Sequence, residues 1–198
     1  MELLGTVLRL QVQRSRLKPG ERGARVYDPV PLLQVVALEV GPRGVVGVTE
    51  DGPLLDVHHA DHPDSRNVKL RNGLSLLPLP HHTALRTRYG EHLFDGAAGE
   101  SLLLDTAGPW TLDALAGPLR LDTADGDLLE LTHAAVASPC VEFSRFCLGR
   151  GLGPVDAAVE QAMRDLDGGA RGFYVRTAGS GRIQAGARLW TVAGSSVG

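Results

Sequence analysis

Short runs of alternating apolar and polar residues, separated by glycine and proline turns, dominate the chain. In residues 7–13, VLRLQVQ, the side chains of Leu8, Leu10 and Val12 fall on one face of a strand. Similar runs cover residues 32–40, 44–49, 68–79, 101–105, 119–122, 128–136, 172–177, 182–184 and 188–192. Many short strands at this spacing are typical of sandwiches and barrels. We therefore predict a mainly β protein, a β-barrel with a few peripheral helices.

Three glycine-containing turn sequences predict tight connections between neighbouring strands. They are GPRG at residues 41–44, TADG at 123–126 and AGSG at 178–181. Glycine accommodates the positive φ angles that short hairpin loops need. We expect each of these turns to close a β-hairpin.

Helical spacing of apolar residues occurs in two segments. Within residues 154–167 the apolar residues recur every three or four positions, behind Pro154 and ahead of the stop signal at Gly168. This is the clearest predicted helix. A shorter one is expected at 140–148, where Cys140 and Cys147 share a face.

Length and composition are those of a soluble globular protein. The 198 residues are 43% apolar and 22% charged, which suits one domain over residues 1–193 with a flexible tail at 194–198. The longest apolar run, 31–40, contains Gln34 and Glu39, and no basic region precedes an apolar one at the start. We therefore expect a cytoplasmic protein with no membrane partner.

The charge is unevenly distributed. A formal net charge of −3 argues against a nucleic-acid partner, yet residues 9–25 hold six cations in a segment predicted to be a loop over 14–29. Arginine favours bidentate capture of phosphate or carboxylate, although exposed solubilising arginines are commoner. The chain has only two lysines, Lys18 and Lys69, which leaves few candidates for a Schiff base, so pyridoxal phosphate is not expected to bind.

Cys140 follows Ser138-Pro139 where a predicted strand ends. Serine is a preferred N-cap and proline suits the first helical position, so Cys140 is expected in the first helical turn. There the positive end of the helix would favour the nucleophilic thiolate. The alternative is a small buried hydrophobe, as most free cysteines are, and this alternative fits Cys147 better.

Two other groups of residues are candidates for chemistry. Residues 56–64, DVHHADHPD, have imidazoles and carboxylates at short spacing, as a divalent-metal site does, but histidines in such a loop are usually just exposed and we assign no metal site. Glu100 is either a catalytic carboxylate or an ordinary surface or network residue.

Four short motifs, in this order along most of the chain, resemble the MOSC domain, the C-terminal module of molybdenum cofactor sulfurases that also occurs as standalone bacterial proteins. Residues 56–58, DVH, and 65–68, SRNV, resemble its G-D-x-H…R-x-V stretch, and 96–102, GAAGESL, its G-x-x-G-E-N-L segment. Cys140 stands where the family has a cysteine after a strand, and 169–176, GARGFYVR, resembles its closing hairpin. Ser101 replaces the usual asparagine, and Gly186-Ala187 replaces Gly-Asp, so the pocket is expected to differ in detail.

The resemblance implies a strand-rich barrel that carries sulfur to a molybdenum-containing pterin (molybdopterin), or binds that cofactor. Cys140 would then be the sulfur-bearing, catalytic residue. The cofactor-binding candidates are Arg66, Arg171, Arg176, Glu100 and His58, with the three arginines expected to converge on an anion. A cysteine desulfurase or other sulfur donor and a molybdoenzyme are the expected partners. The alternatives are a molybdenum-dependent reductase of N-hydroxylated substrates and a non-catalytic binding barrel.

Overall fold

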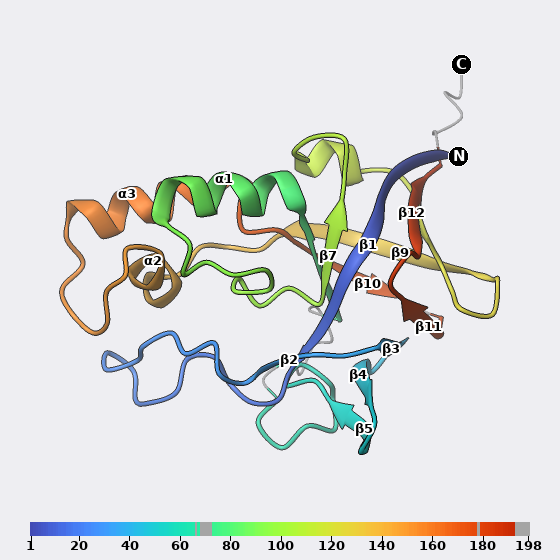
Figure 1. Cartoon of the computed structure of the whole chain (residues 1–198), viewed down its shortest axis with the longest axis horizontal. Coiled ribbons are helices and arrows are strands. Elements are labelled where there is room, and N and C mark those ends of the chain that lie inside the picture. Colours follow the sequence, from blue (N-terminus) through green and yellow to red (C-terminus); the bar gives the residue numbers. More distant parts are fainter. Residues whose placement is uncertain (66, 68–72, 178, 193–198) are drawn as a thin grey trace.

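A closed barrel of seven strands forms the centre of the protein in our computed structural model, which describes residues 1–65, 67, 73–177 and 179–192 (Figure 1). Its strands are β1 (Glu2–Gln13), β6 (Leu74–Pro78), β7 (Leu102–Asp105), β8 (Leu119–Asp122), β9 (Leu128–Val136), β10 (Phe173–Thr177) and β12 (Arg188–Thr191). They pair in the order β12-β8-β9-β10-β6-β7-β1, and β1 closes the ring on β12, where Glu2 lies opposite Thr191. Only β6 and β7 run parallel among these described pairs. The predicted fold class, a mainly β barrel with peripheral helices, is confirmed.

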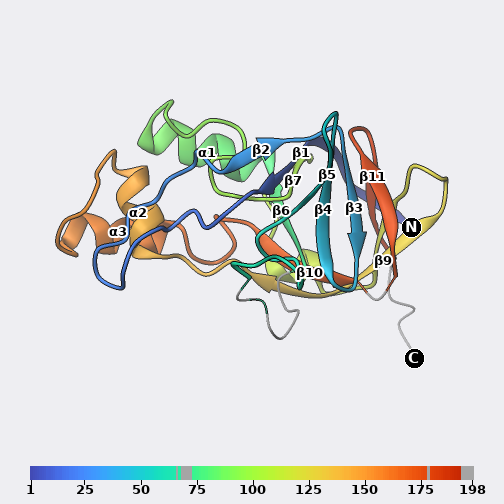
Figure 2. The same ribbon diagram turned by 90° about the horizontal axis from the view of Figure 1, so that it is seen from below.

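A four-stranded antiparallel sheet lies beside the barrel (Figure 2). It is ordered β11-β3-β4-β5 and consists of β3 (Ala37–Gly41), β4 (Gly44–Thr49), β5 (Gly52–Leu55) and β11 (Gly181–Gln184), while β2 (Leu32–Gln34) pairs with the end of β1. The predicted hairpins at 41–44 and 123–126 are present. The hairpin predicted at 178–181 is wrong, because β10 pairs with β9 and β6 whereas β11 pairs with β3. The chain here crosses from the barrel to the second sheet.

The face predicted for the first strand is only partly correct. Leu10 and Val12 are buried as expected, but Leu8 is 46% exposed and Val7, at 1%, takes its place in the core. The register against β7 shifts between Val7 and Arg9, which lie opposite Leu104 and Leu103. Such a bulge adds one residue and therefore reverses which side chains face inward.

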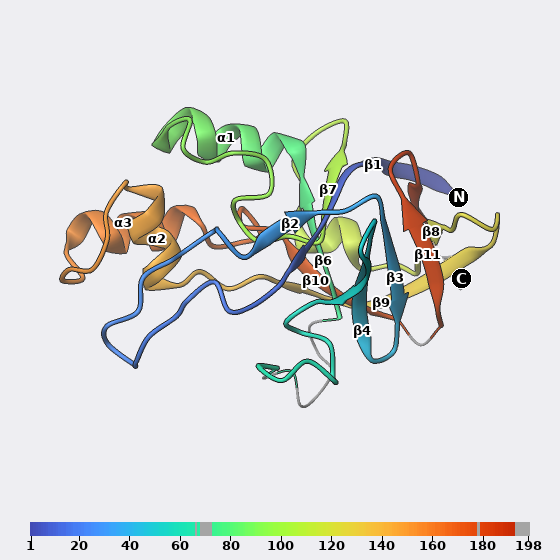
Figure 3. The same ribbon diagram turned by 60° about the horizontal axis from the view of Figure 1, so that its bottom comes forward.

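The α-helices gather at one end of the barrel, as the ribbon views agree (Figures 1 and 3). They are α1 (Leu79–Tyr89), α2 (Val141–Cys147) and α3 (Ala157–Asp165), and a 3-10 turn, η1 (Leu112–Leu115), lies elsewhere. The prediction of a helix within 154–167 is confirmed; α3 begins at Ala157 because Asp156 Oδ1 accepts a hydrogen bond from the Val159 amide at 3.0 Å. None of the described helices is long and apolar enough to cross a membrane.

Helix α1 was not predicted from the sequence, which indicated a strand over residues 68–79. Within the described part of that range the strand ends at Pro78, and Pro80 lies in the first turn of the helix. Only His82 and Leu85 of α1 are buried, so its apolar periodicity is weak.

Two apolar clusters fill the interior. One occupies the barrel and includes Phe173, Leu76 and Leu102. The other lies under α2 and includes Phe143 and Cys147, which is fully buried. Because α2 packs on this second cluster, the start of the helix is fixed against the barrel.

Candidate functional site

An open cavity of about 1010 Å³ lies between the loop after β1, the segment after β5, strands β9 and β10, and the start of α2. Many of its described lining residues are ionisable: Arg16, Lys18, Arg25, Tyr27, His58, Asp64, His133, Cys140, Arg171, Tyr174 and Arg176. Only Asp64 is a carboxylate among them, so the cavity wall is cationic in a chain of net charge −3.

Cys140 lies in the cavity wall as the N-cap of α2. The expectation that Ser138 is the cap and that Cys140 lies inside the first turn is wrong. The carbonyl of Cys140 accepts bonds from the Ser144 amide and hydroxyl, both at 2.9 Å, so the helix begins at Val141. The Cys140 side chain makes no capping bond to the helix amides. A cation from elsewhere in the chain contacts the sulfur instead.

That cation is Arg171, from the segment between α3 and β10. Its Nη1 lies 3.5 Å from Cys140 Sγ and donates to the Ser138 carbonyl at 3.1 Å. The guanidinium carbon lies 4.8 Å from the ring centroid of Phe143. Because the carbonyl and the ring orient the guanidinium, it is positioned to stabilise a thiolate on Cys140.

Arg176, on β10, also lines the cavity, so two of the three arginines expected to converge lie in one wall. Arg66 lies outside the described residues. The sequence analysis assigned no site role to Arg16, Lys18 and Arg25, which the loop after β1 brings into the same cavity. Their clustering in an otherwise acidic chain was the signal for such a role.

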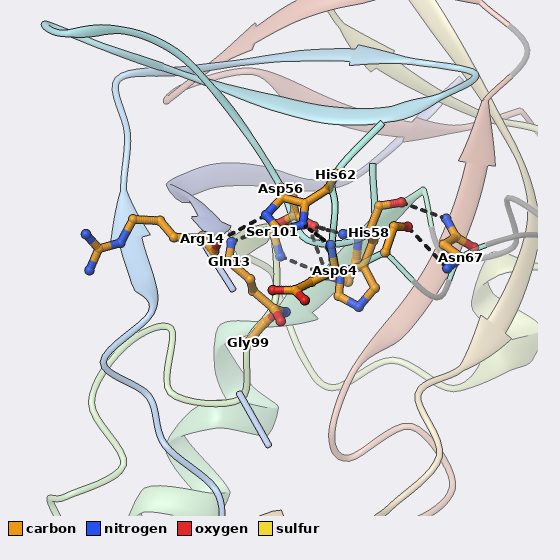
Figure 4. Close-up of polar contacts among 11 residues, drawn as sticks. Gln13, Arg14, Asp56, His58, His62, Asp64, Asn67, Gly99 and Ser101 are labelled. Carbon is orange, nitrogen blue, oxygen red and sulfur yellow. Dashed lines mark hydrogen bonds and ion pairs between the residues drawn. The ribbon is translucent and has the colours of Figure 1, made fainter. Parts of the chain in front are cut away.

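His58 lines the cavity, and its ring contacts the buried carboxylate of Asp56 (Figure 4). Asp56, 4% exposed, accepts the Gln13 amide on Oδ2 at 2.7 Å and the His58 amide on Oδ1 at 2.8 Å. The His58 ring nitrogen Nδ1 lies 2.9 Å from the same Oδ1. The Asn67 side chain donates to the His58 carbonyl at 3.0 Å. The sequence motif placed both residues together but did not show this pairing.

Among the described residues, Gly99 lines the cavity and its neighbour Glu100 does not. The Glu100 side chain is buried instead. Neither of its carboxylate oxygens makes a hydrogen bond of ordinary geometry to a described residue. Burial raises the pKa of Glu100 to about 7, and the nearby Gly96 and Glu100 amides and Arg9 offset only part of this effect. The Glu100 carboxyl group therefore does not face the cavity among the described residues, and its burial favours the neutral form.

Replacing Glu100 by glutamine should change how stability depends on pH. Because the pKa is higher in the folded state, the folded wild type binds the proton more tightly than the unfolded chain, and this stabilisation is present below pH 4.5. This stabilisation is lost as the pH rises from 4.5 to about 7. The loss is about 3 kcal/mol, because each pKa unit corresponds to about 1.4 kcal/mol. Glu100→Gln, neutral throughout, should therefore be more stable than wild type at pH 8, and Glu91→Gln, fully exposed, should not. Urea unfolding at both pH values measures this, and parallel pH curves for wild type and Glu100→Gln would contradict it.

The histidine-rich segment 56–64 forms local hydrogen bonds. His59 Nδ1 accepts the Asp61 amide, His62 Nδ1 accepts the Asp64 amide, and His62 Nε2 contacts the Arg14 carbonyl. The described part of the chain contains no group of three histidine, cysteine or acidic side chains that could hold a metal ion. These histidines therefore order the loop beside His58.

Comparison with known proteins gives a result at the level of structure. No protein-family model and no curated protein matches the sequence. YuaD from Bacillus subtilis matches with a TM-score of 0.55 and 12% identity over 93% of each chain. YiiM from Geobacillus stearothermophilus matches with a TM-score of 0.52 and 18% identity, over 95% of this chain and 75% of that protein. YiiM from Escherichia coli matches with a TM-score of 0.53 and 15% identity, over 98% of this chain and 70% of that protein. The chain thus has the fold of YiiM and YuaD, a MOSC-like β-barrel.

Proposed function

We propose that this chain is a MOSC-type protein that carries sulfur on Cys140 and binds an anionic pterin, such as the molybdenum cofactor, in the adjacent cavity. The observation that carries the proposal is the contact between Cys140 Sγ and Arg171 in the wall of a large cationic cavity. The sequence motifs and the YiiM-like fold support a MOSC-type domain, although identities of 15–18% establish the fold alone.

The residues present fit such a ligand. The cavity of about 1010 Å³ is at the upper end of the range of roughly 300–1,000 Å³ found for small-molecule sites. Arg176, Arg25 and Lys18 would hold the phosphate of the pterin, since guanidinium and ammonium groups bind phosphate strongly. Cys140 would face the reactive end of the ligand. When bound, the cofactor would supply two-electron oxidation–reduction chemistry.

The sulfur-carrying step needs only groups of this chain and a persulfide donor. Arg171 stabilises the Cys140 thiolate, which attacks the terminal sulfur of a donor persulfide, R–S–SH. The donor S–S bond breaks, a new S–S bond forms on Cys140, and the donor leaves as a thiolate, with no net oxidation. A cysteine desulfurase or other persulfide protein would be the donor, and a molybdoenzyme or its cofactor the acceptor.

Protein purified from its own host should carry one additional sulfur atom on the peptide that contains Cys140. Mass spectrometry of wild type, Cys140→Ser and Cys147→Ala tests this, with molybdenum measured in the same samples. We expect the added sulfur in wild type and Cys147→Ala and not in Cys140→Ser.

The remaining results separate the alternatives. Stoichiometric molybdenum, with reduction of an N-hydroxylated base, would instead make the protein a reductase. Neither sulfur nor molybdenum on the wild type would indicate a non-catalytic binding barrel and contradict the proposal.

A further inference from the structure

The hydrogen bonds around Asp56 fix the protonation pattern of the His58 ring. Asp56 receives two backbone N–H groups on its carboxylate oxygens, so it acts as an acceptor. An acceptor 2.9 Å from His58 Nδ1 requires that this nitrogen carry a proton. The ring therefore binds and releases its second proton at Nε2, and a protonated ring is paired with a buried carboxylate.

Two histidines, His58 and His133, line the cavity among the described residues, and they differ in whether a carboxylate contacts the ring. His133 Nδ1 lies 2.9 Å from the Thr132 hydroxyl, and no carboxylate of the described residues pairs with its ring. His58 is held at three points: its ring and amide by Asp56, and its carbonyl by Asn67. Asp56 is in turn fixed by the Gln13 amide of β1, so the imidazole is attached to the barrel (Figure 4).

His58 and Cys140 line the same cavity, where a sulfur donor would bind. In thiol–disulfide exchange the attacking, central and leaving sulfurs are in line, so the leaving sulfur lies roughly 4 Å, two S–S bond lengths, beyond the attacking one. A proton donor for it must therefore come from another part of the cavity wall than Cys140. His58 follows β5 and Cys140 precedes α2, and both residues line the same cavity, so His58 faces a bound donor from a different element than Cys140 does.

We propose that His58 is a second catalytic residue of the sulfur transfer, the general acid that protonates the leaving thiolate. This inference rests on the proposed sulfur-carrier function. The Cys140 thiolate attacks the terminal sulfur, and the donor S–S bond breaks. The electron pair of that bond takes the proton from His58 Nε2, releasing R–SH. His58 is left neutral, with its Nδ1 proton still donated to Asp56, and regains a proton from solvent.

The test uses reagents that differ in how much the leaving group needs a proton. Iodoacetamide releases no thiol, 4,4′-dithiodipyridine releases a thiol that is stable without a proton, and bis(2-hydroxyethyl) disulfide releases a basic alkanethiolate. Rates at Cys140 are measured in a Cys147→Ala background at neutral pH. His58→Gln should slow the reaction with bis(2-hydroxyethyl) disulfide by about 100-fold, the lower end of the usual contribution of a general acid. It should leave the other two rates within about twofold.

The matched control is His62→Gln, a histidine of the same loop whose ring bonds to Arg14 and Asp64 rather than to a buried carboxylate. It should change none of the three rates. In the wild type, ¹⁵N NMR of the histidine rings should show neutral His58 protonated at Nδ1, a readout that needs no variant.

Each other result has a distinct meaning. Equal slowing of all three reagents in His58→Gln, or no slowing of any, overturns the general-acid role while Cys140 remains reactive. A neutral ring protonated at Nε2 does the same. Failure of wild-type Cys140 to react with any of the reagents overturns the proposed function itself, and the role of His58 with it.

Discussion

Iodoacetamide is expected to alkylate Cys140 of the native protein at least about 100-fold faster than Cys147 near neutral pH. Burial raises the pKa of Cys147 to about 12, and its side chain is fully buried beside Phe143. An ordinary exposed thiol has a pKa of about 8.5, so it holds a far larger thiolate fraction than Cys147. Cys140 is partly exposed in the cavity wall. Peptide mapping after timed labelling measures both rates.

Removing the cation beside Cys140 should reduce this reactivity. Arg171→Met deletes the Nη1 contact with Sγ at 3.5 Å, and one charge-assisted hydrogen bond of about 1.4 kcal/mol corresponds to about 10-fold in rate. Arg188→Met, whose arginine pairs with Asp122 on the barrel, is the control. Equal labelling of both cysteines in the wild type would make Cys140 an ordinary structural residue.

Phe173→Ala should lower the free energy of unfolding by about 3–5 kcal/mol, the usual cost of removing a buried phenyl ring. Phe173 is fully buried at the start of β10, where it pairs with Val136 of β9 and Leu76 of β6. A Cβ at Gly169 would lie only 2.4 Å from the ring, so the glycine backbone packs directly against Phe173. Urea denaturation followed by circular dichroism measures the loss.

The matched control for this variant is Phe94→Ala. Phe94 is 42% exposed, so its removal should change the unfolding free energy by less than about 0.5 kcal/mol. A similar loss in both variants would show that the barrel interior contributes no more to stability than the surface. Since β10 also supplies Tyr174 and Arg176 to the cavity, the partly unfolded Phe173→Ala protein should lose any anion binding as well.

Local patterns predicted the strands well, but not the connections that depend on distant segments. The alternation in residues 119–122 and 128–136 and the Asp-Gly turn between them gave the hairpin correctly. The pairing of β11 with β3 depends on segments about 140 residues apart, and no local turn sequence encodes it. The bulge near Leu8 likewise depends on the partner strand β7.

The site shows the same division between local and distant contacts. The sequence showed that imidazoles and carboxylates cluster in residues 56–64, but the specific contact between Asp56 and His58 was not predicted. The contact between Arg171 and Cys140 spans 31 residues, so Arg171 was predicted only to bind an anion and its position at the sulfur was not predicted. The helix end was expected to activate the thiol, but α2 begins after Cys140 and the Cys140 side chain makes no hydrogen bond to the helix amides.

The pairing of Glu2 with Thr191 also bears on how the protein is made. A ribosome adds about 5–20 residues per second, and β12, which closes the ring on β1, is made after all the other described strands. Until then one side of β1 is an unpaired edge, a surface to which other nascent chains can add. Arg171 and β10 are also synthesised late, so nascent Cys140 has no cation beside it. The contact between Arg171 and Cys140 can therefore form only after β9, α2 and α3 have been made.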